Sequence, residues 1–580
     1  MKISRPEYPR PELVRKNWLN LNGKWDFEYD YGNGGIYDDK WKLFGGPEYK
    51  KAKHEVAFTK KINVPFCPES KLSGIGNTDF FDACWYRRTV KVPETWTGRV
   101  LLHFEACYYR SILFINGEYI GKHDGGYTPF TFDITDKVKA GEEFEIMLHA
   151  AGDARDYSQP SGKQSWQRDS HGCFYTRTTG IWQTVWLENV PEEYLVSYKT
   201  ESDVANSTQY FKLTYSGIAH KTITAKISYN GKFLNRVTVE SNSKLAYFSV
   251  KLKDAKLWNI GDPNLYDVEI TTDYGEYKDV VKTYFGMREV SVYGNKFYIN
   301  GKKVLQRLVL DQGYYPDGVY TAPTKEDLMN DINLSLKAGF NGARLHQKVF
   351  ERNFLYNCDK TGYIVWGEYP NWGFGYDNEA YTDIYVREWL ESVERDYNHP
   401  AIIGWCPMNE NWDVENRRQS NGLVLSVYEA TKRFDGTRPV IDVSWNYHVK
   451  TDVFDTHDYV QETEEFDKRF SSGAYDQYHQ TYEGQPYFLS EYGGIAWVKD
   501  GKGWGYGNAP KTEEEFINRY ISMSDSLHKN PDLCALCYTQ LYDVEQEQNG
   551  LYNYDRTPKF SDEVMEKFRA AMAKKSAYED

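Results

Sequence analysis

The sequence predicts a multidomain β and α/β protein in which two β-sandwiches precede a (β/α)8 TIM barrel. Short alternating runs joined by turn dipeptides fill the first half, whereas strand-like and helix-like runs alternate after about residue 289. A chain of 580 residues has room for several domains, at roughly 150 residues each. We expect a jelly-roll β-sandwich over 1–190, an immunoglobulin-like β-sandwich over 191–288 and the (β/α)8 barrel over 289–580.

Hairpin signals support the two sandwiches. Asn116-Gly117 separates two β-rich runs in the first segment, and Asn230-Gly231 does so in the second. Both dipeptides accept the positive φ angles of a tight hairpin turn. The first segment has no long helical period, which favours a jelly roll. The second has about the size of an immunoglobulin-like sandwich and contains no cysteine for an inter-sheet disulfide.

The barrel prediction depends on counting strand-like runs. A helix is expected to open at Thr324 with Asp327 as a near capping box, to place Leu328, Ile332 and Leu336 on one face, and to end at Gly339. Eight strand and helix units over this length are typical of a (β/α)8 barrel. The eight strand-like runs are 304–309, 342–346, 363–367, 401–408, 439–443, 453–456, 486–490 and 533–539.

Composition and charge exclude several classes of partner. Lys and Arg number 70 against 84 Asp and Glu, a net charge of −14. This acidic balance offers no counter-charge to nucleic acid or to an anionic membrane. No run reaches the length of a membrane span, and the start of the chain has no apolar secretory segment, so we expect a soluble, cytoplasmic protein. The eight cysteines are too scattered for a disulfide scaffold, and Cys534 and Cys537 are expected to be reduced core thiols.

Two glutamates follow apolar strands of the predicted barrel. Glu410 follows the fourth strand and Glu491 the seventh, each among aromatic and amide side chains. The carboxyl ends of barrel strands carry catalytic groups. Two carboxyl groups at one rim can cleave a glycosidic bond, one as acid and the other as nucleophile. The competing interpretation is that each glutamate only caps a strand end.

The chain resembles glycoside hydrolase family 2, the family of β-galactosidases, β-glucuronidases and β-mannosidases, along its whole length. The family has the same domain order, so the resemblance implies a jelly-roll sugar-binding domain over 1–190, an immunoglobulin-like sandwich over 191–288 and a catalytic barrel over 289–580. The resemblance is carried by Val14–Trp25, Gly339–Arg344, the Asn398–Trp405 run leading into Asn409-Glu410, and Ser490-Glu491-Tyr492-Gly493.

This resemblance implies roles for particular residues. Glu410 corresponds to the acid/base and Glu491 to the nucleophile. Asn409 corresponds to the amide that binds the 2-hydroxyl, and Arg344 to the cation that supports the nucleophile. Further rim residues expected near the substrate are Asp311, His346, Lys348, Glu368, His457, Asp458, Tyr459, Gln540 and Asp543. No metal and no cofactor are expected, since retaining glycosidases need neither for the chemistry.

The sequence departs from the family's β-glucuronidases in one motif. Those enzymes carry Asn-x-Lys after the eighth strand to hold the substrate carboxylate, and 549–556 has no such triplet. A rim cation such as Arg307 or Lys348 could replace it, because cations pair with carboxylates. The Gly- and Trp-rich segment 497–507 is interpreted as a loop closing over the sugar, with an exposed linker as the alternative.

The resulting functional hypothesis is an exo-acting retaining glycosidase of the β-galactosidase or β-hexuronidase type. Its partner is a small-molecule glycoside or oligosaccharide, and association into homo-oligomers is expected from the family. The alternatives are an α-L-arabinofuranosidase of the same family, a non-catalytic carbohydrate-binding protein on the same scaffold, and a transglycosylase.

Overall fold

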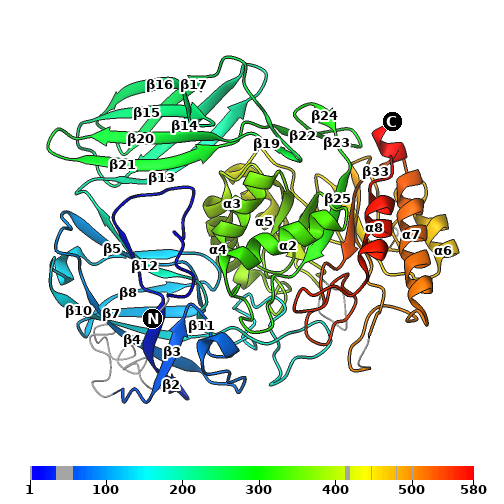
Figure 1. Cartoon of the computed structure of the whole chain (residues 1–580), viewed down its shortest axis with the longest axis horizontal. Helices are drawn as coiled ribbons and strands as arrows, with labels where there is room; N and C mark the ends of the chain where they lie inside the picture. Colours follow the sequence, from blue (N-terminus) through cyan, green and yellow to red (C-terminus); the bar gives the residue numbers. More distant parts are fainter. Residues whose placement is uncertain (1–2, 34–55, 412–417, 446, 479, 499–500) are drawn as a thin grey trace.

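The structure is a computed structural model that describes residues 3–33, 56–411, 418–445, 447–478, 480–498 and 501–580. Two β-sandwiches lie beside a barrel of strands and helices (Figure 1). The N-terminal sandwich is blue to cyan, the central sandwich is green, and the barrel runs from green to red. The predicted order of β and α/β folds is therefore confirmed.

The N-terminal sandwich is built from two antiparallel sheets with the strand orders β1-β12-β5-β9 and β3-β2-β4-β10-β7-β8. The predicted hairpin joins β7 to β8, with φ 51° at Asn116 and 77° at Gly117. The strands are β1 (Trp18–Asn20), β2 (Gly23–Asp30), β3 (Lys60–Val64), β4 (Ala83–Lys91), β5 (Arg99–Phe104), β7 (Arg110–Ile115), β8 (Glu118–Asp124), β9 (Phe130–Asp133), β10 (Glu143–Ala151) and β12 (Val185–Val190), with the short pair β6 (Cys107–Tyr108) and β11 (Gly180–Ile181) beside them.

The central sandwich also has two antiparallel sheets, β13-β14-β17 and β16-β15-β20-β21. Asn230-Gly231 forms the predicted hairpin between β15 and β16. Buried and exposed residues alternate along β15 and β20, as expected where one face of a sheet packs on a core. The strands are β13 (Leu195–Asp203), β14 (Thr208–Tyr215), β15 (Lys221–Tyr229), β16 (Lys232–Ser241), β17 (Leu245–Lys251), β20 (Tyr266–Asp273) and β21 (Lys278–Phe285).

Seven parallel strands of the barrel form one curled sheet in the order β28-β27-β26-β25-β33-β32-β31. The remaining strand, β30 (Val443–Ser444), pairs with β29 (Met408–Asn409), and a bridge from Val440 to Trp405 holds it beside β28. The other strands are β25 (Gln306–Asp311), β26 (Gly342–Leu345), β27 (Ile364–Glu368), β28 (Ile402–Cys406), β31 (Phe454–Asp458), β32 (Tyr487–Gly493) and β33 (Leu533–Thr539). All eight predicted strand positions are therefore occupied.

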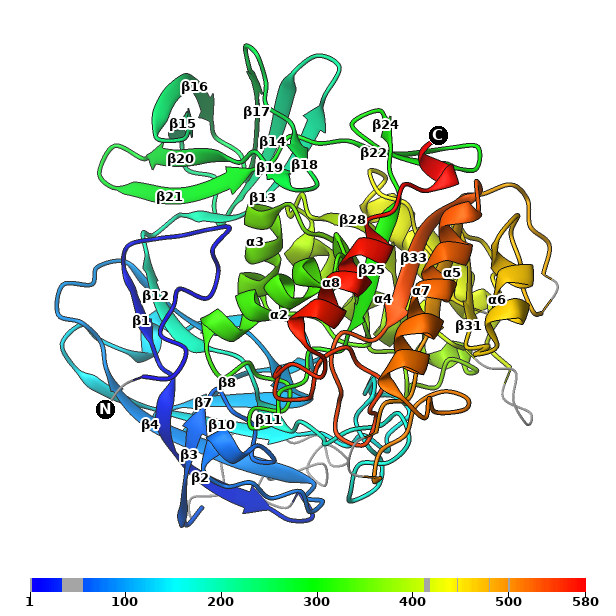
Figure 2. The ribbon, with the colours of Figure 1, turned by 45° about the vertical axis from the view of Figure 1, so that its right-hand side comes forward.

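Helices cover the outside of this sheet (Figure 2). They are α2 (Lys325–Lys337), α3 (Arg352–Thr361), α4 (Thr382–Asp396), α5 (Asn421–Phe434), α6 (Thr463–Phe470), α7 (Glu513–Lys529) and α8 (Asp562–Met572). Thr324 and Asp327 form the predicted capping box at the start of α2. No helix in the described chain is both long and apolar enough to span a membrane.

Two expectations for the barrel were wrong in detail. The described residues between β30 and β31 form no helix, so the fifth strand passes to the sixth without one. Leu336 is 39% exposed, whereas Ser335 is fully buried. Each step of four residues turns the helix by about 40° beyond a full turn. Two such steps, from Leu328 through Ile332 to Leu336, therefore move Leu336 away from the buried face.

The N-terminal sandwich and the barrel share one hydrophobic core. Tyr108, Tyr127, Tyr175 and Trp182 of the sandwich belong to the same cluster of buried side chains as the barrel strands. Polar contacts reinforce this contact surface, for example from Thr128 Oγ1 to Glu391 Oε2 at 2.8 Å. Such a joint fixes the position of the sandwich relative to the barrel.

A long connection between β10 and β11 lies against the end of the barrel. Figures 1 and 2 show it in cyan beside the loops that follow β32 and β33. The backbone N–H groups of Ser161 and Gly162 donate to Trp372 O at 3.2 and 2.8 Å. Gly162 has φ +59°, and a Cβ there would lie 2.7 Å from both Gln347 O and Pro370 Cβ. This glycine allows the two backbones to approach closely.

Substituting Gly162→Ala should therefore loosen this connection. The positive φ and the steric contact should lower the local free energy of opening by about 1 to 3 kcal/mol. Hydrogen exchange of peptides from 152–179, followed by mass spectrometry, measures this change. Gly172→Ala is the matched control, because its φ is +50° but no atom lies within 4 Å of the added Cβ. Equal exchange in the two variants would contradict the role of the close approach.

Candidate active site

Glu410 and Glu491 meet at the carboxyl-terminal rim of the barrel. Glu410 follows β29 and Glu491 lies in β32. One carboxylate oxygen from each, together with a ring nitrogen of His457, lie within 4.8 Å of one another. The strand ends therefore bring together the two glutamates that the sequence placed 81 positions apart.

Glu410 occupies the less charge-compensated position of the two, because no described cation donates to its carboxylate directly. Its side chain is 13% exposed, and Oε1 lies 2.7 Å from His457 Nδ1. Burial raises the pKa of Glu410 to about 7, although the positive charges of Lys163 and Arg344 act in the opposite direction. At neutral pH a large fraction of this carboxyl group therefore carries a proton that it can donate.

Glu491 lies among hydrogen-bond donors. Arg344 Nη1 donates to Oε1 at 3.1 Å, and the Tyr459 hydroxyl donates to Oε2. His457 Nε2 lies 3.5 Å from Oε1. A cation and a hydroxyl at these positions stabilise the negative charge of a carboxylate that must attack as a nucleophile.

Arg344 links the parts of the site. It extends from β26, and its side chain is 1% exposed. Nε donates to Glu368 Oε1 at 2.6 Å, Nη1 to Ser490 O at 2.8 Å, and Nη2 to Asn409 Oδ1 at 2.9 Å. Its carboxylate neighbours hold the pKa of Arg344 well above its usual value. The guanidinium therefore stays charged and orients both an amide and the nucleophile candidate.

Asn409 keeps its side-chain NH2 group for a ligand. Its Oδ1 accepts from Arg344, and its backbone N–H donates to Asn371 Oδ1 at 2.9 Å. Its Nδ2 is buried and has no hydrogen-bond partner. An unsatisfied buried amide costs free energy, so this N–H group is placed to donate to a bound hydroxyl.

His457 acts as a neutral partner of Glu410. Burial, together with the charge of Arg344, lowers the pKa of His457 to about 4, against the opposing effect of Glu491. The ring also lies 2.9 Å from Ser444 Oγ through Nε2. A neutral imidazole can accept a hydrogen bond from protonated Glu410 or donate one to ionised Glu410, depending on its tautomer.

Other predicted rim residues at the strand ends form hydrogen bonds with neighbouring groups, and His346 also lies 3.9 Å from Glu491 Oε1 through Nδ1. His346 Nδ1 lies 3.1 Å from Glu368 Oε2. Asp311 accepts from the Tyr542 hydroxyl and from Gly313 N, and burial raises its pKa to about 6. Gln540 accepts from Gln312 Nε2 at 2.7 Å and donates to Asn549 Oδ1 at 2.7 Å.

Four other cations and acids have structural partners away from the glutamate pair. Lys348 Nζ donates to Gly313 O at 2.5 Å and Tyr320 O at 2.8 Å, so this ammonium holds a loop. Arg307 pairs with Glu579 at the opposite end of β25. Asp458 accepts from Arg469, and Asp543 from Lys559. These contacts give Lys348, Arg307, Asp458 and Asp543 partners within the scaffold, and their contacts with substrate stay predictions.

A pocket of about 510 Å³ opens beside Glu410. Most of its wall is aromatic and comes from two domains, which suits the apolar faces of sugar rings or of an aromatic aglycone. Sequence reasoning missed this wall because its residues lie outside the barrel strand ends. The lining residues are Ala154, Arg155, Tyr157, Trp166, Cys173 and Phe174 of the N-terminal sandwich, with Trp372, Gly373, Phe374, Tyr376 and Glu410 of the barrel.

The Gly- and Trp-rich segment also borders the site. Tyr506 stacks on Tyr459 with ring centroids 3.5 Å apart. Trp504 Nε1 donates to Gly172 O at 2.9 Å, which ties this segment to the N-terminal sandwich. These contacts favour the loop interpretation over an exposed linker. Lys499 and Asp500 of the same segment lie outside the described residues.

Glu410, His457 and Glu491 form the one group within the described ranges whose spacing could hold a metal ion. The same atoms already engage one another and their neighbours: Glu410 contacts His457, and Glu491 accepts from Arg344 and Tyr459. A buried arginine between the nucleophile candidate and Glu368 already supplies positive charge. The donor set therefore suits acid/base chemistry better than a cation site.

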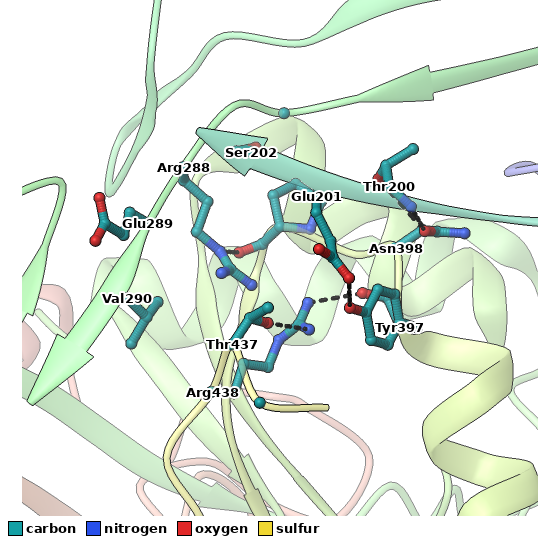
Figure 3. A pocket seen from close by; sticks show the side chains of 13 residues that line it. Thr200, Glu201, Ser202, Arg288, Glu289, Val290, Tyr397, Asn398, Thr437 and Arg438 are labelled. Carbon is teal, nitrogen blue, oxygen red and sulfur yellow. Dashed lines mark hydrogen bonds between the residues drawn. The ribbon is translucent and has the colours of Figure 1, made fainter. Parts of the chain in front are cut away.

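A second pocket lies at the other end of the barrel, against the central sandwich (Figure 3). Its volume is about 290 Å³. Arg288 donates to Pro400 O and Ile402 O, and Tyr397 donates to Glu201 at 2.9 Å. Arg438 pairs with Asp435. Because these contacts join two domains, we interpret this pocket as an interdomain joint.

Three family profiles cover most of the chain. Residues 19–191 match "Glycosyl hydrolases family 2, sugar binding domain", and residues 193–288 match "Glycosyl hydrolases family 2". Residues 290–573 match "Glycosyl hydrolases family 2, TIM barrel domain".

Similar proteins include two kinds of glycosidase. A β-galactosidase of Thermoanaerobacterium thermosulfurigenes is 24% identical over 498 residues, which cover 82% of this chain and 64% of that protein. A β-glucuronidase of Rattus norvegicus is 25% identical over 465 residues, covering 73% and 68%. The chain thus spans less than two thirds of the length of that β-galactosidase.

Solved structures share the fold at lower identity. A β-glucuronidase of an uncultured Clostridium sp. has a TM-score of 0.77 and 20% identity, covering 96% of this chain and 99% of that one. A β-galacturonidase from Eisenbergiella tayi has a TM-score of 0.73 and 17% identity, covering 98% of both chains.

The raised pKa of Glu410 predicts a pH-dependent effect on stability. Burial raises this pKa from 4.5 in the unfolded chain to about 7 in the folded protein. Below pH 4.5 the group is protonated in both states and does not lower the free energy of unfolding. As the pH rises from 4.5 to about 7, the unfolded chain ionises more readily, and the folded protein loses stability. Glu410→Gln cannot ionise and avoids this loss. Its stability relative to wild type should increase by about 2 to 3 kcal/mol from pH 5 to pH 8.

Denaturant unfolding at the two pH values measures this difference. Glu276→Gln, at an exposed position of the central sandwich, is the control and should show no such increase. A difference between Glu410→Gln and wild type that stays constant with pH would contradict the assigned environment of Glu410.

Proposed function

The chain belongs to glycoside hydrolase family 2, and on that basis we propose that it is an exo-acting, retaining glycosidase that removes one terminal β-linked sugar. The observation that carries this proposal is the pair Glu410 and Glu491, with carboxylate oxygens within 4.8 Å of one another. Retaining enzymes place their two carboxyl groups about 5 to 5.5 Å apart. The short distance between one oxygen of each group supports the retaining class over the inverting class, whose carboxyl groups stand about 6.5 to 9.5 Å apart.

The first step breaks the glycosidic bond. Glu491 attacks the anomeric carbon through a carboxylate oxygen, while the Glu410 carboxyl donates its proton to the leaving oxygen. The aglycone departs as a neutral alcohol, and the sugar remains as an ester of Glu491. The raised pKa of Glu410 supports the acid role, and the donors around Glu491 support the nucleophile role.

The second step uses the same groups in reverse. Glu410, now ionised, removes a proton from water as the water attacks the anomeric carbon, and Glu491 leaves as a carboxylate. The neutral His457 ring can stay hydrogen-bonded to Glu410 in both steps. It accepts from the protonated carboxyl in one tautomer and donates to the carboxylate in the other. Two inversions give overall retention of configuration.

Asn409 and Arg344 position these groups. The unpartnered Nδ2 of Asn409 is suited to donate to the sugar 2-hydroxyl, a contact that strengthens as positive charge develops on the ring. Arg344 fixes both the Asn409 amide and the Glu491 carboxylate. The pocket wall supplied by the N-terminal sandwich favours a chain end over an internal sugar unit.

Removing the nucleophile tests the covalent route. We expect wild type to cleave one or more nitrophenyl glycosides from a panel of β-galactoside, β-glucuronide, β-galacturonide, β-glucoside, β-mannoside and α-L-arabinofuranoside. Glu491→Gln keeps the size of the side chain and should lose about three or more powers of ten in kcat/KM. NMR of the first product should show the configuration of the substrate.

The same panel separates the alternatives. Cleavage of the α-L-arabinofuranoside alone would support the α-L-arabinofuranosidase alternative. Transfer of the sugar to an added alcohol in preference to water would indicate a transglycosylase. Sugar binding without cleavage of any substrate would indicate a carbohydrate-binding protein. A product of inverted configuration would contradict the retaining mechanism.

If Glu410 acts as the acid, the rate should fall when the pH rises above the pKa of this carboxyl group, which gives the pH profile its alkaline limb. Because Glu410 must be protonated in the free enzyme, kcat/KM for nitrophenyl substrates should fall above about pH 7. Glu410→Ala should abolish this limb and lower the rate. A dinitrophenyl leaving group, which needs little protonation, should retain most of its first-step rate in the variant, and added azide should accelerate turnover. An unchanged limb in Glu410→Ala would assign it to another group.

A further inference from the structure

Lys163 is an exceptional cation in this structure. It lies in the connection between β10 and β11 of the N-terminal sandwich, and it is 5% exposed. Throughout the described residues, every other Lys or Arg buried to this degree donates to a carboxylate or a backbone carbonyl. No hydrogen bond and no ion pair joins Lys163 Nζ to any described residue. The other buried cations are Arg5, Arg15, Arg177, Lys221, Arg288, Arg344, Lys348, Arg395, Arg438 and Lys559.

Two aromatic rings hold the ammonium group in place. Nζ lies 5.1 Å from the ring centroid of Trp372 and 5.7 Å from that of Tyr175. Trp372 Nε1 in turn donates to Asn409 O at 3.1 Å, so the Trp372 ring connects the cation to the residue that precedes Glu410. Cation–π contacts position a charge, but a neutral ring does not neutralise it.

The backbone around Lys163 is fixed from both domains. Tyr175 N donates to Lys163 O at 2.7 Å within the sandwich. On the other side, the close approach of Gly162 to Gln347 and Pro370 joins the loop to the barrel. The ammonium is therefore placed by rigid surroundings, as a preorganised binding group should be.

The carboxylates around Lys163 have other partners. Glu547 accepts from the Tyr175 hydroxyl and from Asn549 Nδ2. Glu368 and Glu491 pair with Arg344, and Glu410 contacts His457. A buried charge without a direct counter-ion is costly, and a carboxylate on the ligand would provide that counter-ion.

We propose that Lys163 is a specificity-determining residue that binds the carboxylate of a hexuronic acid at the non-reducing end of the substrate. The inference rests on the proposed function and names the class of sugar that the same site accepts. The N-terminal sandwich would then supply the cation for which the barrel segment 549–556 has no Asn-x-Lys triplet. Lys348 already donates to two backbone carbonyls, and Arg307 pairs with Glu579 at the opposite end of β25, so Lys163 is the better placed of the three to bind a carboxylate.

Binding of a carboxylate at Lys163 has a consequence for the acid Glu410. The charge of Lys163 lowers the pKa of Glu410, so a counter-ion on Lys163 weakens that effect. For a hexuronide, the fall of kcat at alkaline pH reports Glu410 in the enzyme–substrate complex, and the fall of kcat/KM reports Glu410 in the free enzyme. The fall of kcat should therefore occur at higher pH. A neutral sugar at the same site should show a smaller displacement.

The test compares charged and neutral substrates in Lys163→Met and Lys163→Arg. The substrates are nitrophenyl β-glucuronide and β-galacturonide, each beside its neutral counterpart, the β-glucoside and the β-galactoside. Loss of one charge-assisted hydrogen bond is worth about 1.5 to 3 kcal/mol, so Lys163→Met should lower kcat/KM for the hexuronide about 10- to 150-fold, mainly through KM. Lys163→Arg should restore part of it. Lys253→Met, at an exposed position of the central sandwich, controls for loss of a charge.

Three kinetic outcomes decide the proposal. A selective loss on the hexuronide, with the neutral sugar changed only a few-fold, supports it. A parallel loss on both substrates, with the alkaline limb displaced to higher pH, would show that Lys163 acts only through Glu410 and would overturn it. A wild type that cleaves neutral glycosides and neither hexuronide would also overturn it.

A binding measurement keeps this inference separate from the proposed function. Calorimetric titration with free glucuronate and galacturonate, beside glucose and galactose, needs no turnover. If wild type cleaves nothing but binds a uronate that Lys163→Met does not bind, the glycosidase proposal fails and the carboxylate site stands. If wild type cleaves glycosides and Lys163→Met binds uronates as tightly as wild type, the carboxylate site fails alone.

Discussion

The Arg344 guanidinium is the interaction on which the site depends. It extends from β26 and reaches Glu368 on β27, Asn409 on β29, and the Ser490 carbonyl and Glu491 on β32. One rigid planar group thus holds the ends of four strands in register. Removing it would leave two buried carboxylates without a counter-charge, a change that is strongly destabilising for buried ion pairs. Position, charge and stability at this rim therefore depend on the same side chain.

Glu410 and Glu491 show how one residue type acquires two chemical roles. Glu491 accepts from a cation and a hydroxyl, whereas Glu410 has a neutral imidazole as its nearest polar partner. The difference arises from the residues that each strand end faces, not from the glutamates themselves. Paired carboxyl groups in unlike surroundings are the usual basis for separating an acid from a nucleophile.

The order of domains, the strand ends and the two glutamates could be predicted because they follow from local patterns. Alternation, turn dipeptides and a polar residue after an apolar run are all read within a few positions. Lys163 and Trp372 carry no such signal: they lie 209 positions apart and meet only because two domains pack together. The glycine that permits this approach could not be distinguished from any other loop glycine. Likewise, the exposure of Leu336 and the missing helix after β30 depend on packing against neighbours that the sequence does not display.

The core shared by the N-terminal sandwich and the barrel has a consequence for biosynthesis. Tyr127 and Trp182 leave the ribosome early, yet their barrel ring partners Tyr320 and Tyr369 follow about 140 to 190 residues after Trp182. At the usual speed of translation, about 5 to 20 residues per second, these rings stay uncovered for roughly 7 to 40 seconds. A nascent chain with such a delay is a natural client for chaperones. Production in a host should therefore depend on translation speed and chaperone supply as well as on the stability of the finished fold.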